Sequence, residues 1–276
     1  MIMEKISKAQ VKLVRSLQQK KFRDELGLFV AEGEKCVEEL RKGFDLQLKI
    51  KNYELLSQEE DGVLSATRSE IEQMSGLRTP QGVIGVFKKG MRGLADECVS
   101  GSTNPQSTNP LILCLDGIQD PGNLGTIIRT CDWFGVHDIV CSLDTADCFN
   151  PKVVQATMGA LARVRLHYVN LPEWMKELKI KNYELRIYGT LLEGKDMYEV
   201  LSVQRSDSAT VCQQSGLSAK RSIIVMGNEG NGISQEVRSL ITHPIRIPSY
   251  PKDAETSESL NVSIATAIVL AEFRRP

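Results

Sequence analysis

The sequence lacks an excess of charge of either sign. Its 276 residues include 34 Lys or Arg and 35 Asp or Glu, which gives a formal net charge of −1. A domain that binds nucleic acid usually carries a basic patch or stripe, so any such surface on this protein must be local. Hydrophobic residues make up 41% and charged residues 25% of the chain. This composition is typical of a folded globular protein and argues against a disordered one.

Long apolar runs are also missing. No run approaches the ~18 consecutive apolar residues of a membrane-spanning helix. The first ten residues, MIMEKISKAQ, have no apolar segment of the kind found in a secretory signal. The chain is long for one domain. We therefore predict a soluble, cytoplasmic protein of two domains that does not associate with membranes.

The cysteines and histidines do not have the spacing of a metal site. The seven cysteines are an odd number, and no two of them form a C-x-x-C pair. Most lie inside apolar runs, which predicts reduced, buried thiols that pack as small hydrophobic side chains. The three histidines, His137, His167 and His243, share no ligand spacing. The sequence therefore predicts no metal site, and nothing in it indicates a Ser–His–Asp triad.

A basic segment lies near the start of the chain. Residues 5–23 contain seven Lys or Arg and no acid, and apolar residues recur there at helical spacing, which predicts one amphipathic helix. Four basic residues, spaced 3, 4 and 3 apart, are expected to form a stripe along one face of this helix: Lys5, Lys8, Lys12 and Arg15. This basic stripe could be an ordinary solvated helix face, or it could contact the phosphates of RNA.

The rest of the N-terminal region indicates a small α/β domain over residues 1–90. A helix is predicted over 34–44, and short strands over 46–50 and 82–87. Residues 91–109 then change to a composition rich in Ser, Thr, Asn, Gly and Pro, which is typical of a linker. We expect this linker to let the N-terminal domain move relative to the rest of the chain.

Residues 110–276 alternate between strand and helix patterns. Such alternation predicts a mostly parallel sheet with helices on both faces, interrupted by a polar insertion at 202–221. Ligands of parallel sheets bind at the carboxyl ends of the strands, where three loops stand out. The predicted strands are 111–115, 138–142, 164–169, 184–192, 222–227 and 243–247, and the predicted helices are 124–135, 150–161, 171–179, 233–241 and 258–275.

The first of these loops is Asp116–Arg129. Gly122 and Gly125 are expected to let the backbone turn before a helix, whose N-terminus could bind an anion. Asn123 and Arg129 could act on a ligand there, or they could be a capping residue and a solvent-facing cation.

The second and third loops are also rich in turn-forming or polar residues. Residues 226–234 have three glycines within six residues, with Glu229 between them. Residues 246–263 form a polar loop before a helix that is expected to begin near Ser259. Thr256, Ser257 and Ser259 are candidate helix caps, and Asn261 would then fall in the first turn of the helix.

These loops carry residues that resemble the three signature motifs of the SpoU/TrmH family, which are RNA ribose 2′-O-methyltransferases of the SPOUT class. The matching stretches are NLGTIIRT, VMGNEGNGIS and IP followed by SLNVS. Residues 12–40 also resemble the family's substrate-binding domain, an α/β module similar to certain RNA-binding ribosomal proteins. The resemblance implies an α/β domain with a deep trefoil knot over residues 110–276, S-adenosylmethionine as cofactor, and a homodimer with each active site at the subunit interface.

The resemblance also implies roles for particular residues. An arginine such as Arg129 would act near the ribose 2′-hydroxyl. Arginine is almost always protonated, so we favour positioning and electrostatic stabilisation over simple base catalysis, although the alternative stays open. The catalytic positions implied are Asn123, Arg129, Glu229, Ser259 and Asn261. The cofactor positions implied are Thr190, Leu191, Met226, Gly227, Ile247 and Leu260.

The leading prediction is an enzyme that methylates a ribose hydroxyl in RNA, with ribosomal RNA favoured by the auxiliary domain. One alternative is a catalytically silent RNA-binding protein of the same fold, which the five matched catalytic positions disfavour. Another is a small-molecule nucleotide enzyme, which should show a Rossmann glycine fingerprint that is absent here. The 202–221 insertion and the 251–257 loop are longer than in the family and could alter which RNA is accepted.

Overall fold

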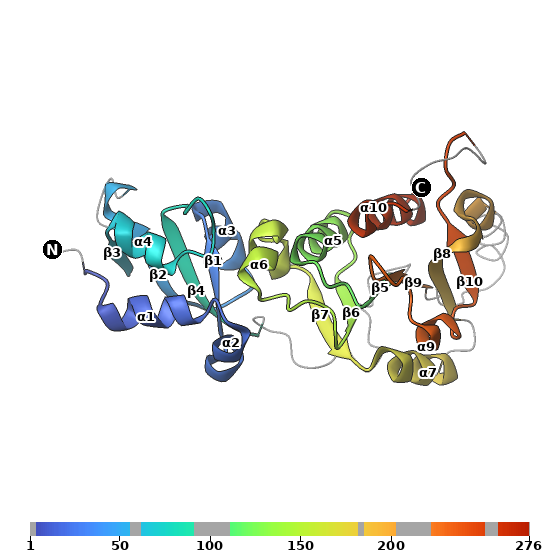
Figure 1. Cartoon of the computed structure of the whole chain (residues 1–276), viewed down its shortest axis with the longest axis horizontal. Helices are drawn as coiled ribbons and strands as arrows, with labels where there is room; N and C mark the ends of the chain where they lie inside the picture. Colours follow the sequence, from blue (N-terminus) through green and yellow to red (C-terminus); the bar gives the residue numbers. More distant parts are fainter. Residues whose placement is uncertain are drawn as a thin grey trace, which may run out of the picture. The chain divides into compact units, whose positions relative to one another are not determined.

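The computed structural model of the protein describes residues 4–55, 62–90, 111–181, 185–202, 222–251 and 259–275 (Figure 1). Contacts divide the chain into two units. Unit 1 combines residues 1–95 with 124–129 and 147–163, and unit 2 combines the remaining residues. The predicted linker 91–109 and most of the 202–221 and 251–257 insertions lie outside the described residues, so the expected domain boundaries stay predictions.

A four-stranded mixed sheet forms the centre of the N-terminal part of unit 1. Its strands lie in the order β1 (Leu28–Glu32), β4 (Val83–Lys88), β2 (Leu46–Asn52) and β3 (Val63–Ala66). β4 is antiparallel to both β1 and β2, whereas β2 and β3 are parallel. The helices are α1 (Lys8–Ser16), α2 (Lys20–Leu26), α3 (Glu34–Leu40) and α4 (Arg68–Met74), and a 3₁₀ turn spans Tyr53–Leu55.

The apolar core of this part lies between α1, α4 and the sheet. Val14 and Leu17 meet Ile71 and Met74 there, and all four are fully or almost fully buried. Each helix begins at a capping box. Ser7 accepts the backbone N–H of Gln10 at the start of α1, and Thr67 does the same for Glu70 at the start of α4. The apolar periodicity of the basic segment therefore did identify residues that form the core.

The prediction of a single helix over residues 5–23 is wrong. The chain forms two helices, α1 and α2, separated by residues 17–19. The guanidinium of Arg23 donates hydrogen bonds to the carbonyl oxygens of Leu17 and Gln18, both at 2.9 Å. The helix is interrupted because these carbonyl oxygens, at the end of α1, bind a side chain. Lys5 precedes α1 and pairs with Ser65 of β3. Lys5 therefore does not belong to the same helical stripe as Lys8.

Unit 2 contains a six-stranded, fully parallel sheet, so the predicted α/β fold is confirmed. The strand order is β10 (His243–Arg246), β8 (Arg186–Asp196), β9 (Ser222–Gly227), β5 (Leu111–Asp116), β6 (Asp138–Ser142) and β7 (Arg165–Val169). The central strands β5 and β9 are buried almost along their whole length, as expected for strands covered on both faces. The trefoil knot stays a prediction.

Helices lie on both sides of this sheet. Figure 1 shows α7 (Leu171–Lys181) and α9 (Gln235–Arg238) on one side and α10 (Val262–Phe273) on the other. Arg274 follows α10 and donates to the carbonyl oxygen of Phe134, at the end of α5 (Pro121–Trp133). Within the described residues, no helix has both the length and the apolarity that crossing a membrane requires.

The described cysteines are buried, as predicted. They are Cys36, Cys114, Cys131, Cys141 and Cys148. Burial raises the pKa of the Cys36 thiol to about 11, so this side chain is un-ionised near neutral pH. Cys98 and Cys212 lie outside the described residues.

Candidate active site

The carboxyl ends of β5 and β9 lie next to each other because the two strands are neighbours in a parallel sheet. Two hydrogen bonds tie together the loops that follow them. The side-chain amide of Asn228 donates to the carbonyl oxygen of Gly117 at 2.6 Å, and the backbone N–H of Ser234 donates to Asp116 Oδ2 at 2.7 Å. The first and second predicted loops therefore form one joined structure at this edge of the sheet.

The first loop leads into α5 by a cap that leaves Asn123 available for other contacts. Asp120 is the N-cap and accepts the backbone N–H of Asn123 at 2.7 Å, and Pro121 is the first helical residue. The expectation that Gly122 and Gly125 make a turn before the helix is wrong, because both lie inside α5. A methyl group at Gly125 would overlap the side chain of Ala156, so this glycine allows close helix packing.

Three of the predicted catalytic side chains meet in a hydrogen-bonded network. Asn123 Nδ2 donates to Glu229 Oε1 at 2.9 Å, and Asn261 Nδ2 donates to Asn123 Oδ1 at 3.0 Å. Asn123 is partly buried, and Glu229 and Asn261 are exposed. We call these three residues the amide–carboxylate network. It brings one residue from each of the three loops into contact.

Asn261 also fixes the start of α10. Its Oδ1 accepts the backbone N–H of Ser263 at 3.0 Å and the Ser263 hydroxyl at 2.6 Å, and α10 begins at the next residue, Val262. The expectation of a helix that starts near Ser259, with Asn261 in its first turn, is therefore wrong. Ser259 lies two residues before the cap and is exposed. Thr256 and Ser257 lie outside the described residues.

The second loop is a tight turn that holds Glu229 at its tip. Asn228 and Gly232 exchange two backbone hydrogen bonds of 2.9 Å, and Asn228 Oδ1 accepts the backbone N–H groups of Gly230 and Asn231. A methyl group at Gly227 would overlap the backbone of Gly232 and Ile233. Glycine is required at this position because the two arms of the turn are in contact.

Five of the six predicted cofactor residues lie in or directly after three adjacent parallel strands, and Leu260 lies in the loop before α10. Gly189 of β8 lies opposite Val225 of β9, so Thr190 and Leu191 follow at the level of Met226 and Gly227. Thr190 Oγ1 donates to the carbonyl oxygen of Val225 at 3.2 Å.

Ile247 directly follows β10, which is paired with β8 on the other side. Leu191 and Ile247 are partly buried, and Leu260 is 50% exposed. Apolar side chains beside backbone polar groups at the carboxyl edge of a parallel sheet suit the binding of an adenosine group. These residues therefore fit S-adenosylmethionine.

Arg129 lies on the same helix as Asn123 but on a different face. Six residues along an α-helix correspond to a rise of roughly 9 Å and a rotation of roughly 120° away from Asn123. The Arg129 side chain is exposed. α5 therefore does not present Arg129 on the side of the helix where Asn123 joins the amide–carboxylate network.

The predicted RNA-contacting residues are accessible to solvent, but one other cation of the basic segment is buried. Lys5, Lys8, Lys12 and Arg15 are all exposed. Arg23 belongs to the same segment but is only 2% exposed and forms an ion pair with Asp147, so it is not available to RNA.

Within the described ranges, no group of three or more His, Cys, Asp or Glu side chains could hold a metal ion.

The sequence does not indicate the roles of two residues that support the site. Asp116 and Asn228 join the loops after β5 and β9. The available signal was a carboxylate or amide directly after an apolar strand, which is typical of the carboxyl edge of a parallel sheet.

Comparison with known proteins gives a consistent result over both parts of the chain. Residues 110–271 match the SpoU rRNA Methylase family, and residues 8–85 match the MRM3-like substrate binding domain. The 23S rRNA (guanosine(2553)-2′-O)-methyltransferase RlmP of Bacillus subtilis is 29% identical, with 98% of each chain covered.

Solved structures are similar over the same extent. A TrmH-family protein from Porphyromonas gingivalis shares 34% identity with a TM-score of 0.73, and 98% of each chain is covered. An rRNA methyltransferase from Sinorhizobium meliloti, solved with bound AdoMet, shares 29% identity with a TM-score of 0.75. The comparison covers 99% of this chain and 97% of that one.

Proposed function

Because the chain belongs to the SpoU rRNA methylase family, we propose that it transfers the methyl group of S-adenosylmethionine to a ribose 2′-hydroxyl of ribosomal RNA. The observation that supports this most directly is the amide–carboxylate network, because it joins one residue from each of the three family motifs. The S. meliloti relative was solved with AdoMet, and the residues at the carboxyl ends of β8, β9 and β10 suit the same cofactor.

The network has hydrogen-bonding capacity left for a substrate. Each asparagine amide has two N–H donors, and Asn123 and Asn261 each use one within the network. Glu229 Oε2 can accept a hydrogen bond in addition to the one that Oε1 receives. A ribose placed here would donate its 2′-hydroxyl to Glu229 and accept from the free amide hydrogens.

A ribose hydroxyl is a weak nucleophile, so the chemistry depends on its placement and on removal of its proton. When bound, S-adenosylmethionine supplies an electrophilic methyl group on a sulfonium. Glu229 would orient the hydroxyl and accept its proton as the methyl group is transferred, and Asn123 would hold Glu229 in place. The Arg129 guanidinium would stabilise negative charge that develops on the ribose oxygen or on the adjoining phosphate. Ser259, two residues before Asn261, would line the site.

The position of Arg129 on α5 is explained if the active site lies between two protomers. We propose a homodimer in which Arg129 of one protomer completes the network of its partner. Two large apolar side chains favour such an interface, because Trp133 at the end of α5 is 84% exposed and Ile264 in the first turn of α10 is 52% exposed. In this proposal the second protomer covers the exposed apolar side chains of these two helices.

The N-terminal part of the chain would capture the RNA. Lys5, Lys8, Lys12 and Arg15 are exposed and would contact phosphates, while the network in unit 2 performs the chemistry. In this proposal the protein acts in the cytoplasm. The target nucleotide is open, and the name of the B. subtilis relative makes 23S rRNA the first substrate to test.

The test is methyl transfer from labelled S-adenosylmethionine to rRNA by the purified full-length protein. The RNA should come from cells that lack the gene, so that the target is unmodified. We expect label at one ribose 2′-oxygen, mapped by the resistance of the adjoining bond to alkali, and no label with Asn123→Ala. Label on a base, or RNA binding without transfer, would contradict the proposal and favour a different modification or a silent RNA-binding protein.

A further inference from the structure

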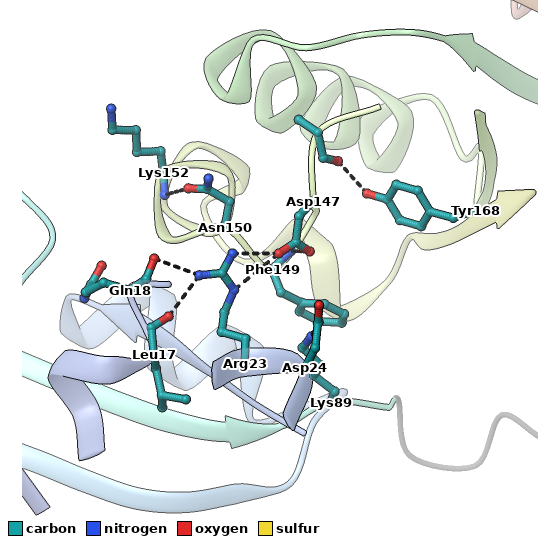
Figure 2. Close-up of polar contacts among 11 residues, drawn as sticks. Leu17, Gln18, Arg23, Asp24, Lys89, Asp147, Phe149, Asn150, Lys152 and Tyr168 are labelled. Atoms are coloured by element: carbon teal, nitrogen blue, oxygen red, sulfur yellow. Dashed lines mark hydrogen bonds and ion pairs between the residues drawn. The ribbon is translucent and has the colours of Figure 1, made fainter. Parts of the chain in front are cut away.

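The basic segment that is expected to bind RNA contains one cation that faces inward. The guanidinium of Arg23 donates to the carbonyl oxygens of Leu17 and Gln18, and its Nε and Nη2 donate to Asp147 Oδ2 at 3.2 and 2.7 Å (Figure 2). Arg23 is 2% exposed and Asp147 is 14% exposed. A charge this deeply buried carries a large desolvation cost unless it is fully paired, and here four hydrogen bonds provide the pairing.

Asp147 also shapes the chain that leads into α6 (Pro151–Thr157). Its Oδ1 accepts the backbone N–H of Phe149 at 3.0 Å, and its carbonyl oxygen accepts the backbone N–H of Asn150 at 2.9 Å. Asn150 then caps α6 by accepting the backbone N–H of Lys152 at 3.0 Å. The carboxylate therefore joins Arg23 to the turn that starts this helix.

Phe149 fills an aromatic cluster of the N-terminal part. Its ring centroid lies 4.8 Å from that of Phe29 and 6.1 Å from that of Phe44. Lys89 Nζ lies 5.2 Å from the centroid of the Phe149 ring, on its face. Phe29 and Phe44 are almost completely buried, so Phe149 completes an apolar core that residues 1–90 alone would leave open.

Two further contacts join the N-terminal part to residues 162 and 163. A Cβ atom at Gly43 would lie 2.6 Å from the carbonyl oxygen of Ala162, so only glycine fits without displacement. Arg163 Nη1 donates to Glu39 Oε2 at 2.9 Å. The N-terminal part therefore contacts residues 147–163 through ion pairs, through aromatic rings and through a close approach of the backbone at Gly43.

Residues 147–163 are also the connection between β6 and β7, two strands of the parallel sheet in unit 2. Within unit 1, the N-terminal part thus packs against a segment whose sequence belongs to the methyltransferase half of the chain.

We propose that Arg23, Asp147 and Phe149 form a clasp that positions RNA for methyl transfer. The clasp holds the N-terminal RNA-binding part on the β6–β7 connection, so that captured RNA reaches the amide–carboxylate network in one register. The three residues are positioning residues, because they touch neither the RNA nor the cofactor. This inference rests on the proposed function.

Two variants disturb the clasp by independent means. Asp147→Asn leaves a single carbonyl oxygen, which cannot serve both Arg23 and the Phe149 N–H, and it directs an N–H group at the guanidinium. Gly43→Val inserts a side chain against Ala162 without changing any charge. The matched control is Glu72→Gln, the same change of a carboxylate to an amide in an ion pair of α4, where the carboxylate is 52% exposed and pairs with Arg68.

The test combines single-turnover kinetics with hydrogen–deuterium exchange on the full-length protein, well below its unfolding temperature. Both clasp variants should lower the methyl-transfer rate at saturating rRNA and S-adenosylmethionine by about tenfold or more, as expected for substrate held out of reacting geometry. Both dissociation constants should stay within about twofold. Amides of residues 150–163 should exchange faster in both variants, and the control should match the wild type in every measurement.

Three outcomes would overturn the inference. Wild-type rates with accelerated exchange at 150–163 would mean that the clasp exists but does not position RNA. Loss of affinity for both S-adenosylmethionine and RNA, together with the rate, would mean that these residues only support folding. A wild-type protein that methylates no RNA would refute the proposed function and the positioning role together, whereas an active wild type with unaffected variants refutes the positioning role alone.

Discussion

Two polar networks in this protein use similar hydrogen bonds but differ in their access to solvent. The amide–carboxylate network joins Asn123 to the exposed side chains of Glu229 and Asn261. The clasp joins Arg23 to Asp147, and both are largely buried. The first network keeps unused donors and an unused carboxylate oxygen, whereas all the hydrogen bonds of the Arg23–Asp147 pair are made to the protein itself. The unused hydrogen-bonding groups suit the first network to bind a ligand, whereas the Arg23–Asp147 pair has a structural role.

Arg129 tests whether the exposed network is sufficient for catalysis. Arg129→Ala should lower the rate of methyl transfer by about 10²–10³, the usual cost of removing a preorganised donor to developing charge. The affinity for S-adenosylmethionine should stay unchanged, because the proposed partners of Arg129 are ribose and phosphate. Single-turnover assays and calorimetry measure the two quantities. Full activity of Arg129→Ala would remove Arg129 from the mechanism.

Gly227 tests the turn that supports Glu229. Gly227→Val should weaken S-adenosylmethionine binding by about tenfold or more, roughly 1.4 kcal/mol or above, because its side chain would overlap the backbone of Gly232 and Ile233. Gly230→Ala is the matched control, since its Cβ would meet only Asn228 Oδ1, at 3.6 Å. Calorimetry should find near wild-type affinity in the control. Equal decreases in both variants would mean that the turn does not determine cofactor binding.

The exposed cations of the basic segment can be separated from the buried one. Replacing Lys5, Lys8, Lys12 and Arg15 by Gln should weaken RNA binding. It should also make the slope of log affinity against log salt shallower by up to about 0.7–0.9 for each phosphate that the protein no longer neutralises. S-adenosylmethionine affinity should not change. A salt titration of RNA binding measures this, and an unchanged slope would show that these residues are an ordinary solvated surface.

Asn261 belongs to the exposed network and also caps α10, and two substitutions separate these roles. Asn261→Ala should lower the free energy of unfolding by about 1 kcal/mol because the cap is removed. Asn261→Asp retains a capping oxygen but has no amide to donate to Asn123, so stability should be kept while methyl transfer falls. Thermal unfolding and the transfer assay measure the two effects. Equal activity of Asn261→Asp and the wild type would limit Asn261 to its capping role.

The sequence predicted the parallel sheet well because its signals are local. The apolar run 111–115 and the run 222–227 each have the composition of strands that are buried on both faces, and both are strands of the sheet. The grouping of Asn123, Glu229 and Asn261 could be expected from the resemblance. The loops that carry the three motifs follow parallel strands, and the carboxyl ends of parallel strands lie at the same edge of the sheet. Composition and spacing alone gave no distances among residues that lie so far apart in the chain.

The errors occurred where tertiary contacts override a local pattern. The helix predicted over 5–23 is interrupted because the buried Arg23 binds the carbonyl oxygens at the end of α1, whereas a basic residue is usually exposed. Gly125 resembled a turn residue, but it lies in α5 and allows close packing against α6. Ser259 and Asn261 are both good helix caps by residue type, and it is Asn261 that accepts the backbone N–H of Ser263 and donates to Asn123.

The amide–carboxylate network has a consequence for how the protein folds. Asn123 bonds to residues 106 and 138 positions later in the chain. Contacts of such separation close long loops, which is entropically costly and slows folding. The strand pairings of the four-stranded sheet in unit 1 join residues that are closer together in the chain. A refolding chain should therefore regain its far-ultraviolet circular dichroism before its ability to transfer a methyl group. The delay measures the docking of the start of α10 against the first turn of α5, which carries Asn123.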